Sequence, residues 1–397
     1  MIPPPLSVLY LHSSDDLYGS DRALLSLIRR LDSRRFHPRV LLPADAPFPG
    51  PLSLALNQIG VRSDRLAMPV LRRRYLSPTG LPLLAWRMLW ARRALRSCTT
   101  HQPLSLMHSN TSAVLAGALS ANSLGIPHIW HSRELVQRPL IARKLLARML
   151  HRRSTRVIAV SRAVADHLLA DQPRLAPRLT VIPDAVDTRR FSPDTAPANL
   201  RQAWGVADDE TLVGVVGRLS RWKGQDFFLR AFANASRHAP ALRAILIGSP
   251  LPDDAQRLPA LQAQAQRLGI ADKVRWPGYL DDMPTVMAAL DALVLPSVQP
   301  EPFGLVVIEA MASGKPVIAT AHGGPAESIV HGETGLLVSP HDPEEMAEAL
   351  VLLARKPLFR QNLGWAGRKR ALRLFGLDAH VRAIENLYMQ VLSEKID

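Results

Sequence analysis

The chain has 397 residues, of which 47% are hydrophobic and 21% are charged. This length allows two domains, and the composition is that of a folded globular protein rather than a disordered one. The single cysteine, Cys98, excludes an intrachain disulfide and a cysteine-based zinc site, which favours a reducing compartment.

Charge is distributed unevenly along the chain. Residues 1–190 hold 28 Lys/Arg and 11 Asp/Glu, a net +17, whereas residues 191–397 have a net charge of −2. A basic half beside a near-neutral half indicates two roles, one of which meets a polyanionic surface. No apolar run approaches the roughly 18 residues of a membrane span, so we expect no transmembrane anchor. No basic region precedes the apolar run near the N-terminus, so we expect no signal peptide.

Short apolar segments alternate with amphipathic segments throughout the sequence. In the first half, strands are predicted at 6–11, 40–42, 104–108, 128–131, 157–160 and 179–182, with a helix at 21–31. In the second half, strands are predicted at 212–217, 244–247, 274–276, 292–295, 316–319 and 335–338. Strands that alternate with helices predict parallel sheets covered on both faces.

Two such series predict an α/β protein with two doubly wound domains. Pro183, Pro193 and Pro197 interrupt the periodic pattern, which places the boundary between residue 183 and about residue 210. We predict domains at 1–190 and 191–375, followed by an amphipathic helix at 376–397 that packs back on the first domain. Because ligands of open parallel sheets bind at the carboxyl ends of the strands, the chemistry is expected in the loops that follow them.

The loop after the strand at 212–217 carries cations between two glycines. Its sequence is Gly217-Arg218-Leu219-Ser220-Arg221-Trp222-Lys223-Gly224. Glycine lets the backbone approach a ligand, Arg218 offers a planar fork of donors and Lys223 a compact charge, a combination that suits a diphosphate. A solvated basic loop has the same composition, so this loop alone leaves both interpretations open.

Two carboxylates flank the predicted start of an apolar helix in the second half. The segment Pro300-Glu301-Pro302-Phe303-Gly304-Leu305 leads into a helix at 306–312 that contains Glu309. The backbone amides of 303–305 open this helix, and a helix N-terminus favours anions. Glu301 precedes the helix and Glu309 lies within it, so the two carboxylates are expected to reach different parts of one elongated ligand.

Glu301 and Glu309 form the Glu-x7-Glu pattern of retaining glycosyltransferases with the GT-B fold, in which two Rossmann-like domains face a cleft. Together with Arg218 and Lys223 earlier in the chain, they make the sequence resemble glycosyltransferase family 4. The resemblance covers residues 6–375 and includes the segments Ala310-Met311-Ala312-Ser313-Gly314-Lys315-Pro316-Val317, Gly323-Gly324-Pro325-Ala326-Glu327 and Gly332-Glu333-Thr334-Gly335-Leu336-Leu337-Val338. It implies a retaining hexosyltransferase whose donor is a nucleotide-diphosphate sugar.

The resemblance implies a role for each of these residues. Arg218 and Lys223 would neutralise the donor diphosphate, and Glu309 would accept hydrogen bonds from the ribose hydroxyls. Glu301 would bind sugar hydroxyls rather than act as a covalent nucleophile, and the amides of Phe303, Gly304 and Leu305 would fix the sugar and phosphates. The expected mechanism is front-face displacement. The chain contains no Asp-x-Asp, so the metal-bridged diphosphate of the other major glycosyltransferase fold is not expected, and fixed cations take the place of the metal. We expect no cofactor.

Three segments of the first half also resemble the family. Leu17-Tyr18-Gly19-Ser20-Asp21-Arg22 resembles its Gly-Gly-x-Glu loop, but only Gly19 is present, so a stiffer loop is expected there. His131, in Trp130-His131-Ser132-Arg133-Glu134, matches the histidine that the family places near the reactive carbon of the donor sugar. Without the resemblance, such a histidine is more often structural. Arg133 and Glu134 fit a subgroup that builds bacterial surface polysaccharides, and Asp184-Ala185 replaces the family's Asn-Gly.

Two arginine-rich amphipathic stretches lie in the first half. One comprises Leu71-Arg72-Arg73-Arg74 and residues 81–96, including Trp86 and Trp90, and the other is 139–153. Basic amphipathic helices with tryptophan are typical of membrane surfaces, although a core helix with a solvated arginine face has the same pattern. We favour an anionic membrane as partner. The expected protein is cytoplasmic, peripheral on the inner face of the plasma membrane, and uses a lipid-linked glycan as acceptor.

Two other classes of protein are consistent with parts of the sequence. A basic nucleic-acid-binding module would explain the charge but not the two motifs, and no nucleic-acid motif is apparent, so no nucleic acid is expected as partner. Another GT-B enzyme, such as a sugar phosphorylase or a sugar-nucleotide epimerase, is not excluded by fold. The sugar, the base, the linkage and the acceptor are not specified by the sequence.

Overall fold

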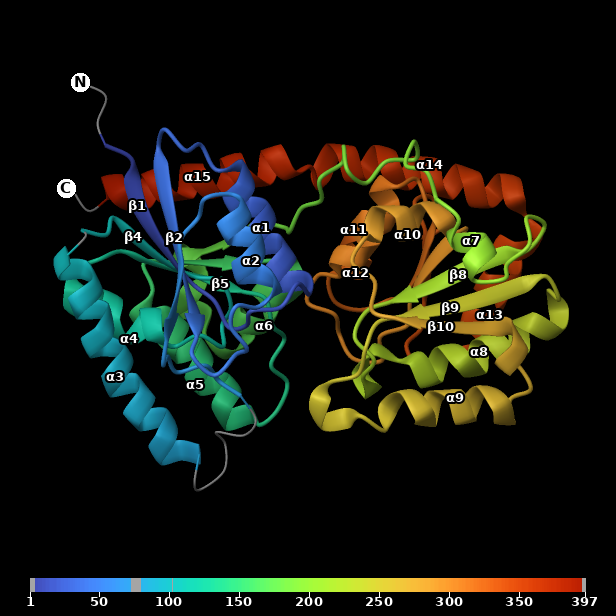
Figure 1. Ribbon diagram of the computed structural model, residues 1–397, viewed down its shortest axis with the longest axis horizontal. Helices are drawn as coiled ribbons and strands as arrows, with labels where there is room; N and C mark the ends of the chain where they lie inside the picture. The colour runs from blue at the N-terminus through green and yellow to red at the C-terminus, as the bar shows by residue number, and fades with distance from the viewer. Residues whose placement is uncertain (1–3, 73–79, 102, 395–397) are drawn as a thin grey trace. The chain divides into compact units, whose positions relative to one another are not determined.

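The computed structural model describes residues 4–72, 80–101 and 103–394, which form two compact units (Figure 1). The first unit comprises Met1–Asp184 with Leu377–Asp397, and the second comprises Ala185–Gly376. The chain therefore enters the second unit a few residues before the predicted boundary at 190. It returns to the first unit for its last helix, as predicted.

The first unit is built on a parallel sheet, in which seven described strands run in the order β3-β2-β1-β4-β5-β6-β7. The strands are β1 (Leu6–Leu11), β2 (Phe36–Pro43), β3 (Ser63–Leu66), β4 (Leu106–Ser109), β5 (His128–Ser132), β6 (Arg156–Ala159) and β7 (Leu179–Val181). The predicted parallel sheet is confirmed, but β3 was not predicted. Its sequence, Ser-Asp-Arg-Leu, is polar and not fully buried, because β3 is an edge strand with one neighbour.

Helices cover both faces of this sheet. They are α1 (Gly19–Arg30), α2 (Pro51–Gln58), α3 (Gly80–His101), α4 (Ala116–Leu124), α5 (Leu140–Arg153), α6 (Arg162–Asp171), the 3₁₀ helix η2 (Pro173–Arg178) and α15 (Leu377–Ser393). The helix α1 contacts α2 and α15, while α3, α4, α5 and α6 contact one another in sequence. Right-handed crossovers explain this division, because the strand order proceeds in opposite directions from β1 and from β4. No helix among the described residues is long and apolar enough to cross a membrane.

The second unit repeats this architecture with six described strands in the order β10-β9-β8-β11-β12-β13. The strands are β8 (Thr211–Val216), β9 (Leu242–Ile247), β10 (Val274–Gly278), β11 (Ala292–Leu295), β12 (Val317–Thr320) and β13 (Leu336–Val338). The helices are α7 (Leu200–Ala203), α8 (Gln225–His238), α9 (Arg257–Arg267), α10 (Met283–Ala289), α11 (Leu305–Ala312), α12 (Pro325–Ser328), α13 (Pro343–Arg355) and α14 (Pro357–Leu374), with 3₁₀ turns η3 (Arg221–Lys223), η4 (Pro252–Asp254) and η5 (Ala271–Lys273). All the described pairs of strands are parallel, so the second predicted series is also confirmed.

The helix α8 is firmly packed in the second unit. Phe227, Phe228 and Phe232 are buried in its inner face, and α8 packs closely against α13 and α9. Burying each such side chain contributes roughly 1.5–3 kcal/mol. The loop that precedes α8 therefore starts from one buried strand and ends on a firmly packed helix.

In each sheet the strand order reverses at one place, between β1 and β4 in the first unit and between β8 and β11 in the second. Ligands of doubly wound sheets bind beside the carboxyl ends of strands at this reversal. Gly19 is the first residue of α1, which follows β1, while Lys223 follows β8 and Glu301 follows β11. Gly19, Lys223 and Glu301 thus follow strands at the two reversals, whereas His131 lies on β5, one strand farther along the first sheet.

Candidate active site

The loop after β8 is shaped by glycines. Gly224 has φ 72°, and a Cβ at this position would lie 1.8 Å from the carbonyl oxygen of Pro296, so no other residue fits without a shift of the backbone. Gln225, at the start of α8, donates from Nε2 to the carbonyl oxygen of Arg218 at 3.1 Å. The end of the loop at Gly224 therefore packs against Pro296, which follows β11, and the end at Arg218 is held by Gln225 of α8.

Lys223 and Glu301, two of the predicted site residues, are in direct contact. Lys223 Nζ donates to both carboxylate oxygens of Glu301 at 2.8 Å, and Ser297 Oγ donates to Oε2 at 2.9 Å. Lys223 Nζ also lies 4.3 Å from the centre of the Trp222 ring, a cation–π distance. The two charged side chains are only 16% and 9% exposed, so the pair has a fixed geometry and little screening by water.

The backbone around Glu301 is held by a second close approach. Glu301 forms an isolated parallel bridge with Gly323, and the amide of Gly324 donates to the carbonyl oxygen of Glu301 at 2.8 Å. A Cβ on Gly323 would lie 2.2 Å from that same oxygen. The Gly-Gly pair of the predicted Gly323-Gly324-Pro325 segment is therefore needed to bring this backbone against Glu301.

The helix α11 begins beside Glu301 and carries the second carboxylate. Gly304 has φ 85° and is the N-cap residue, so the helix starts at Leu305, one residue before the predicted start. Phe303 is buried and packs edge-on against Phe375, with 5.9 Å between ring centroids. Glu309 lies in the second turn and is half-buried. The amides of 303–305 thus lie at a helix N-terminus whose partial positive charge favours an anion.

Arg218 lies two residues beyond β8 and is half-buried. The structure therefore gathers the predicted residues of the second half on one edge of one sheet, where Lys223 and Glu301 make direct contact. Ser297 and Trp222, which touch this pair, were not singled out from the sequence. Ser297 could have been predicted from the sequence, because it lies two residues after the carboxyl end of β11, where ligand-binding residues are expected.

In the first unit, a buried carboxylate holds the loop that leads from β1 to Gly19, the first residue of α1. Asp21 Oδ1 lies 2.8 Å from His12 Nε2 and accepts a hydrogen bond from Ser14 Oγ at 2.7 Å, while Oδ2 accepts from the amide of Tyr18 at 3.1 Å. Burial alone would raise the pKa of Asp21, but its hydrogen bonds and the charge of His12 hold that pKa below its ordinary value. Gly19 is the first residue of α1, so these contacts fix the loop directly at its position.

His131 is completely buried at the carboxyl end of β5, with its ring centroid 5.5 Å from that of His108. His108 Nδ1 in turn lies 2.6 Å from the hydroxyl of Tyr388 on α15. Among the described residues, neither ring nitrogen of His131 has a hydrogen-bond partner. Burial, with the charge of Arg133, lowers the pKa of His131 well below the ordinary range. The imidazole is therefore neutral near pH 7, with one donor and one acceptor to offer.

Arg133 has a structural partner that its sequence position did not reveal. Its Nη1 donates to both carboxylate oxygens of Asp184 at 2.5 Å, and its Nε donates to the carbonyl oxygen of Asn110 at 3.1 Å. Asp184 is the last residue before the chain enters the second unit. The next residue, Ala185, stands where the family has glycine. It does not form a left-handed turn, because among the described residues only Ala198 and His341 combine a positive φ with a side chain.

Within residues 4–72, 80–101 and 103–394, no group of three or more His, Cys, Asp or Glu side chains is placed to hold a metal ion. The polar groups gathered around the site in the second unit are a lysine, a carboxylate, a serine and backbone amides. Such a set is suited to bind a polyhydroxylated anion through charge-assisted hydrogen bonds, each worth roughly 1.5–3 kcal/mol.

Known proteins match both units. Residues 18–190 match the family described as Glycosyltransferase Family 4, and residues 198–370 match that described as Glycosyl transferases group 1. A D-inositol 3-phosphate glycosyltransferase of Frankia alni is 32% identical over 332 residues, which are 78% of this chain and 81% of that protein. For an enzyme of the same name from Corynebacterium urealyticum, the match is 36% identical but spans only 42% of that protein.

Solved structures match nearly the whole chain. The crystal structure of Anabaena Alr3699/HepE in complex with UDP-glucose is 25% identical, with a TM-score of 0.83, and the match covers 97% of this chain and 100% of that one. Sucrose-phosphate synthase from Thermosynechococcus elongatus shares the fold, with a TM-score of 0.79 and 23% identity. The two sheets and these matches define a glycosyltransferase of the GT-B fold. More specifically, the chain belongs to glycosyltransferase family 4.

Proposed function

We propose that this glycosyltransferase moves a hexose from a nucleotide-diphosphate sugar to an acceptor hydroxyl, with retention of anomeric configuration. The observation that carries the proposal is the contact between Lys223 and Glu301 beside the N-terminus of α11. This arrangement offers a cation and backbone amides to a diphosphate, and a fixed carboxylate to sugar hydroxyls. The UDP-glucose bound to the related Anabaena protein supports a nucleotide sugar as donor here.

In the proposed mechanism, the bond between the sugar's anomeric carbon and the phosphate oxygen breaks while the acceptor oxygen attacks from the same face. The proton of the acceptor hydroxyl passes to the departing phosphate oxygen. Arg218 and Lys223 stabilise the charge that develops on the diphosphate. The carboxylate of Glu301 is already engaged by Lys223 and Ser297, which supports a role in binding the sugar rather than in covalent attack. Neutral His131 would bind a sugar hydroxyl.

The outer surface of α3 and α5 supports an acceptor held at a membrane. Large apolar side chains of both helices are exposed, namely Leu83, Trp86, Leu89, Trp90, Leu140, Ile141 and Leu145. They lie among exposed cationic side chains, namely Arg92, Arg93, Arg96, Lys144 and Arg148. The helix α4 contacts both α3 and α5, so the two helices belong to one face of the first unit. We therefore propose an anionic membrane surface as partner and a lipid-linked glycan of the cell surface as acceptor.

Not every predicted membrane-binding arginine is available for this surface. Arg72 and Arg87 both form ion pairs with Asp45, at 3.4 and 3.0 Å, and Arg143 pairs with Asp171. Arg73 and Arg74 lie outside the described residues. The surface is thus defined by the exposed apolar and cationic residues of α3 and α5 named above.

A second acceptor is favoured by the relatives, which are named as D-inositol 3-phosphate glycosyltransferases. A phosphorylated cyclitol would need no membrane, so the two acceptors are separated by an activity assay. A lipid-linked glycan predicts turnover that requires vesicles and an intact α3–α5 surface, whereas an inositol phosphate predicts turnover in free solution.

Reversal of Arg92 and Arg93 to glutamate is expected to weaken co-sedimentation with phosphatidylglycerol vesicles by at least about 30-fold. Each arginine near an anionic surface contributes about 1 kcal/mol, and reversal also adds repulsion. Reversal of Arg29 and Arg34, which are exposed elsewhere in the same unit, is the charge-matched control and should have a much smaller effect. Equal co-sedimentation of the two variants would contradict the membrane proposal.

Turnover is expected without a metal ion, because Arg218, Lys223 and the N-terminus of α11 supply the countercharge for the diphosphate. The measurement is the release of nucleoside diphosphate from a nucleotide sugar, with and without acceptor, in the presence of EDTA. We expect acceptor-dependent release that EDTA leaves unchanged. Loss of release with EDTA, restored by magnesium or manganese, would overturn the metal-independent mechanism. Phosphate-dependent cleavage of a glycan to a sugar 1-phosphate, with no nucleotide sugar consumed, would instead indicate a phosphorylase.

A further inference from the structure

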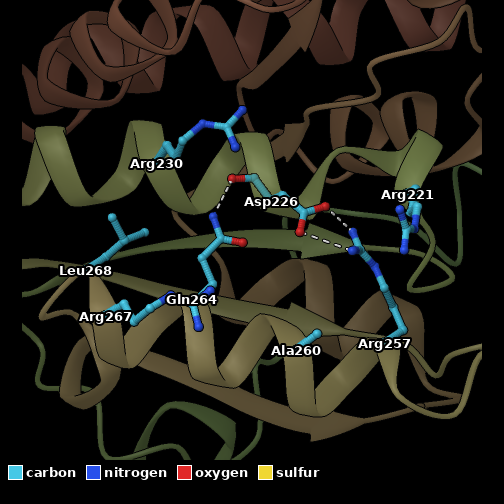
Figure 2. A pocket seen from close by; sticks show the side chains of 8 residues that line it. All are labelled: Arg221, Asp226, Arg230, Arg257, Ala260, Gln264, Arg267 and Leu268. Atoms are coloured by element: carbon cyan, nitrogen blue, oxygen red, sulfur yellow. Dashed lines mark hydrogen bonds and ion pairs between the residues drawn. The ribbon is translucent and has the colours of Figure 1, made fainter.

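A basic pocket lies in the second unit, between the helices α8 and α9 (Figure 2). Its volume is about 580 Å³, which is within the usual range for small-molecule sites. It is lined by Arg221, Asp226, Arg230, Arg257, Ala260, Gln264, Arg267 and Leu268. Neither Lys223 nor Glu301 lines this pocket, nor do Arg218 and Glu309. It is therefore distinct from the site at the ends of β8 and β11.

The charge of this pocket is strongly unbalanced. Arg257 donates from Nη1 to Asp226 Oδ1 at 3.0 Å and from Nη2 to Oδ2, which neutralises the one carboxylate in the lining. The side chains of Arg221, Arg230 and Arg267 have no hydrogen-bond or ion-pair partner among the described residues. All three are exposed, so water and salt screen their mutual repulsion, but together they give the pocket a positive potential that attracts an anion.

One wall of the pocket is held rigidly. The Arg257 side chain is 7% exposed, its guanidinium is fixed by Asp226, and its buried Nε has no partner among the described residues. Gln264 donates from Nε2 to the carbonyl oxygen of Asp226 at 3.0 Å, so α9 is tied to the first turn of α8. Figure 2 shows these contacts spanning the space between the two helices. The two helices that carry most of the lining are therefore held together before a ligand binds, whereas the exposed side chains of Arg221, Arg230 and Arg267 become ordered only on binding.

We propose that this pocket binds a small molecule that carries more than one phosphate group. Guanidinium groups match phosphate oxygens in pairs, and three unpartnered arginines exceed what a single phosphate needs. Ala260 and Leu268 provide apolar contact for the rest of the ligand. Arg221 belongs to the same 3₁₀ turn, η3, as Lys223. A ligand bound to Arg221 would therefore contact the loop that carries Arg218 and Lys223. The proposal does not depend on the proposed function, because the two sites share no side chain.

Pyrophosphate is the probe for this pocket, used in calorimetric titrations of the full chain. Wild-type protein is expected to bind it at two sites, one at Arg218 and Lys223 and one in the pocket. In the double variant Arg230→Gln/Arg267→Gln, the affinity of the pocket for pyrophosphate should fall at least about ten-fold. The site at Arg218 and Lys223 should bind pyrophosphate as in the wild type. Arg218→Ala should weaken pyrophosphate binding at the site of Arg218 and Lys223 and leave binding in the pocket unchanged. Arg237→Gln, an exposed arginine farther along α8, is the matched control and should bind as the wild type does.

The two sources of phosphate are separated by a vesicle arm. Co-sedimentation with phosphatidylinositol bisphosphate vesicles that requires Arg230 and Arg267 would assign a lipid headgroup. Pyrophosphate binding that requires both arginines, with no such requirement for co-sedimentation, would assign a soluble ligand. Binding of pyrophosphate by the double variant at wild-type affinity and stoichiometry would overturn the proposal. Loss of all binding in Arg218→Ala would also overturn it, since every phosphate would then bind at the donor site.

Discussion

Replacement of Lys223 with alanine is expected to lower kcat/KM for the nucleotide sugar by roughly 10²–10³-fold, which is the typical cost of removing one preorganised group that stabilises transition-state charge. Lys223 is the cation beside the proposed diphosphate site, and its Nζ contacts both oxygens of Glu301. The substitution therefore removes a countercharge and also leaves a carboxylate that is 9% exposed without its cation. Both effects weaken binding of the departing diphosphate.

Steady-state kinetics with varied donor and saturating acceptor measure this effect. Lys273→Ala removes the same side chain from an exposed turn, η5, of the same unit and should leave kcat/KM unchanged. Circular dichroism distinguishes a lost contact from a lost fold. Wild-type kcat/KM in folded Lys223→Ala protein would show that the pair with Glu301 is structural and that the donor binds elsewhere.

Asp184→Ala is expected to destabilise the first unit by about 3–5 kcal/mol, the usual effect of removing one partner of a buried ion pair. The side chains of Arg133 and Asp184 are 7% and 5% exposed, and their atoms lie 2.5 Å apart. Without Asp184, the guanidinium remains buried with one hydrogen bond, from Nε to Asn110. The desolvated charge then favours the unfolded state.

Urea unfolding followed by a signal from the first unit measures this change. Arg62→Ala breaks an ion pair whose side chains are 66% and 36% exposed, and it should cost no more than about 1 kcal/mol. The double substitution Arg133→Met/Asp184→Leu should recover part of the stability lost in Asp184→Ala, because it leaves no buried charge unpaired. Equal stability of Asp184→Ala and Arg62→Ala would contradict this account of the pair.

The fold was largely predictable because most of its strands are buried on both faces and therefore contain apolar runs. All twelve predicted strands correspond to strands of the structure, within a few residues at each end. β3 was missed because an edge strand needs no apolar sequence. β2 was predicted too short, since His37 and Arg39 interrupt its apolar run although the strand extends from Phe36 to Pro43. The local hydrophobic pattern of a segment does not show whether it pairs with a neighbouring strand, and this pairing determines the existence of β3 and the length of β2.

The residues proposed for the site came from motif spacing, but the contacts among them did not. The direct pairing of Lys223 with Glu301 depends on the close approach of Gly224 to Pro296, which joins loops far apart in the sequence. The contact of His12, which directly follows β1, with Asp21 in the first turn of α1 depends on the conformation of the loop between them. Neither is encoded in a spacing rule.

The basic stretches of the first half show a similar limit. Arg87 and Arg92 look alike in the sequence, yet Arg87 pairs with Asp45 while Arg92 is exposed. An acidic partner supplied by another segment of the chain decides which arginine remains on the surface.

The central claim is that the second unit binds a nucleotide-diphosphate sugar between the loop after β8 and the start of α11. Thermal unfolding of the wild type and of Glu309→Ala, measured against a panel of nucleotide sugars, tests it most directly. We expect at least one nucleotide sugar to stabilise the wild type, by roughly 2.7 kcal/mol at 100 times its dissociation constant, and to stabilise Glu309→Ala far less at the same concentration. Equal stabilisation of both proteins, or no stabilisation of the wild type by any nucleotide sugar, would contradict the account.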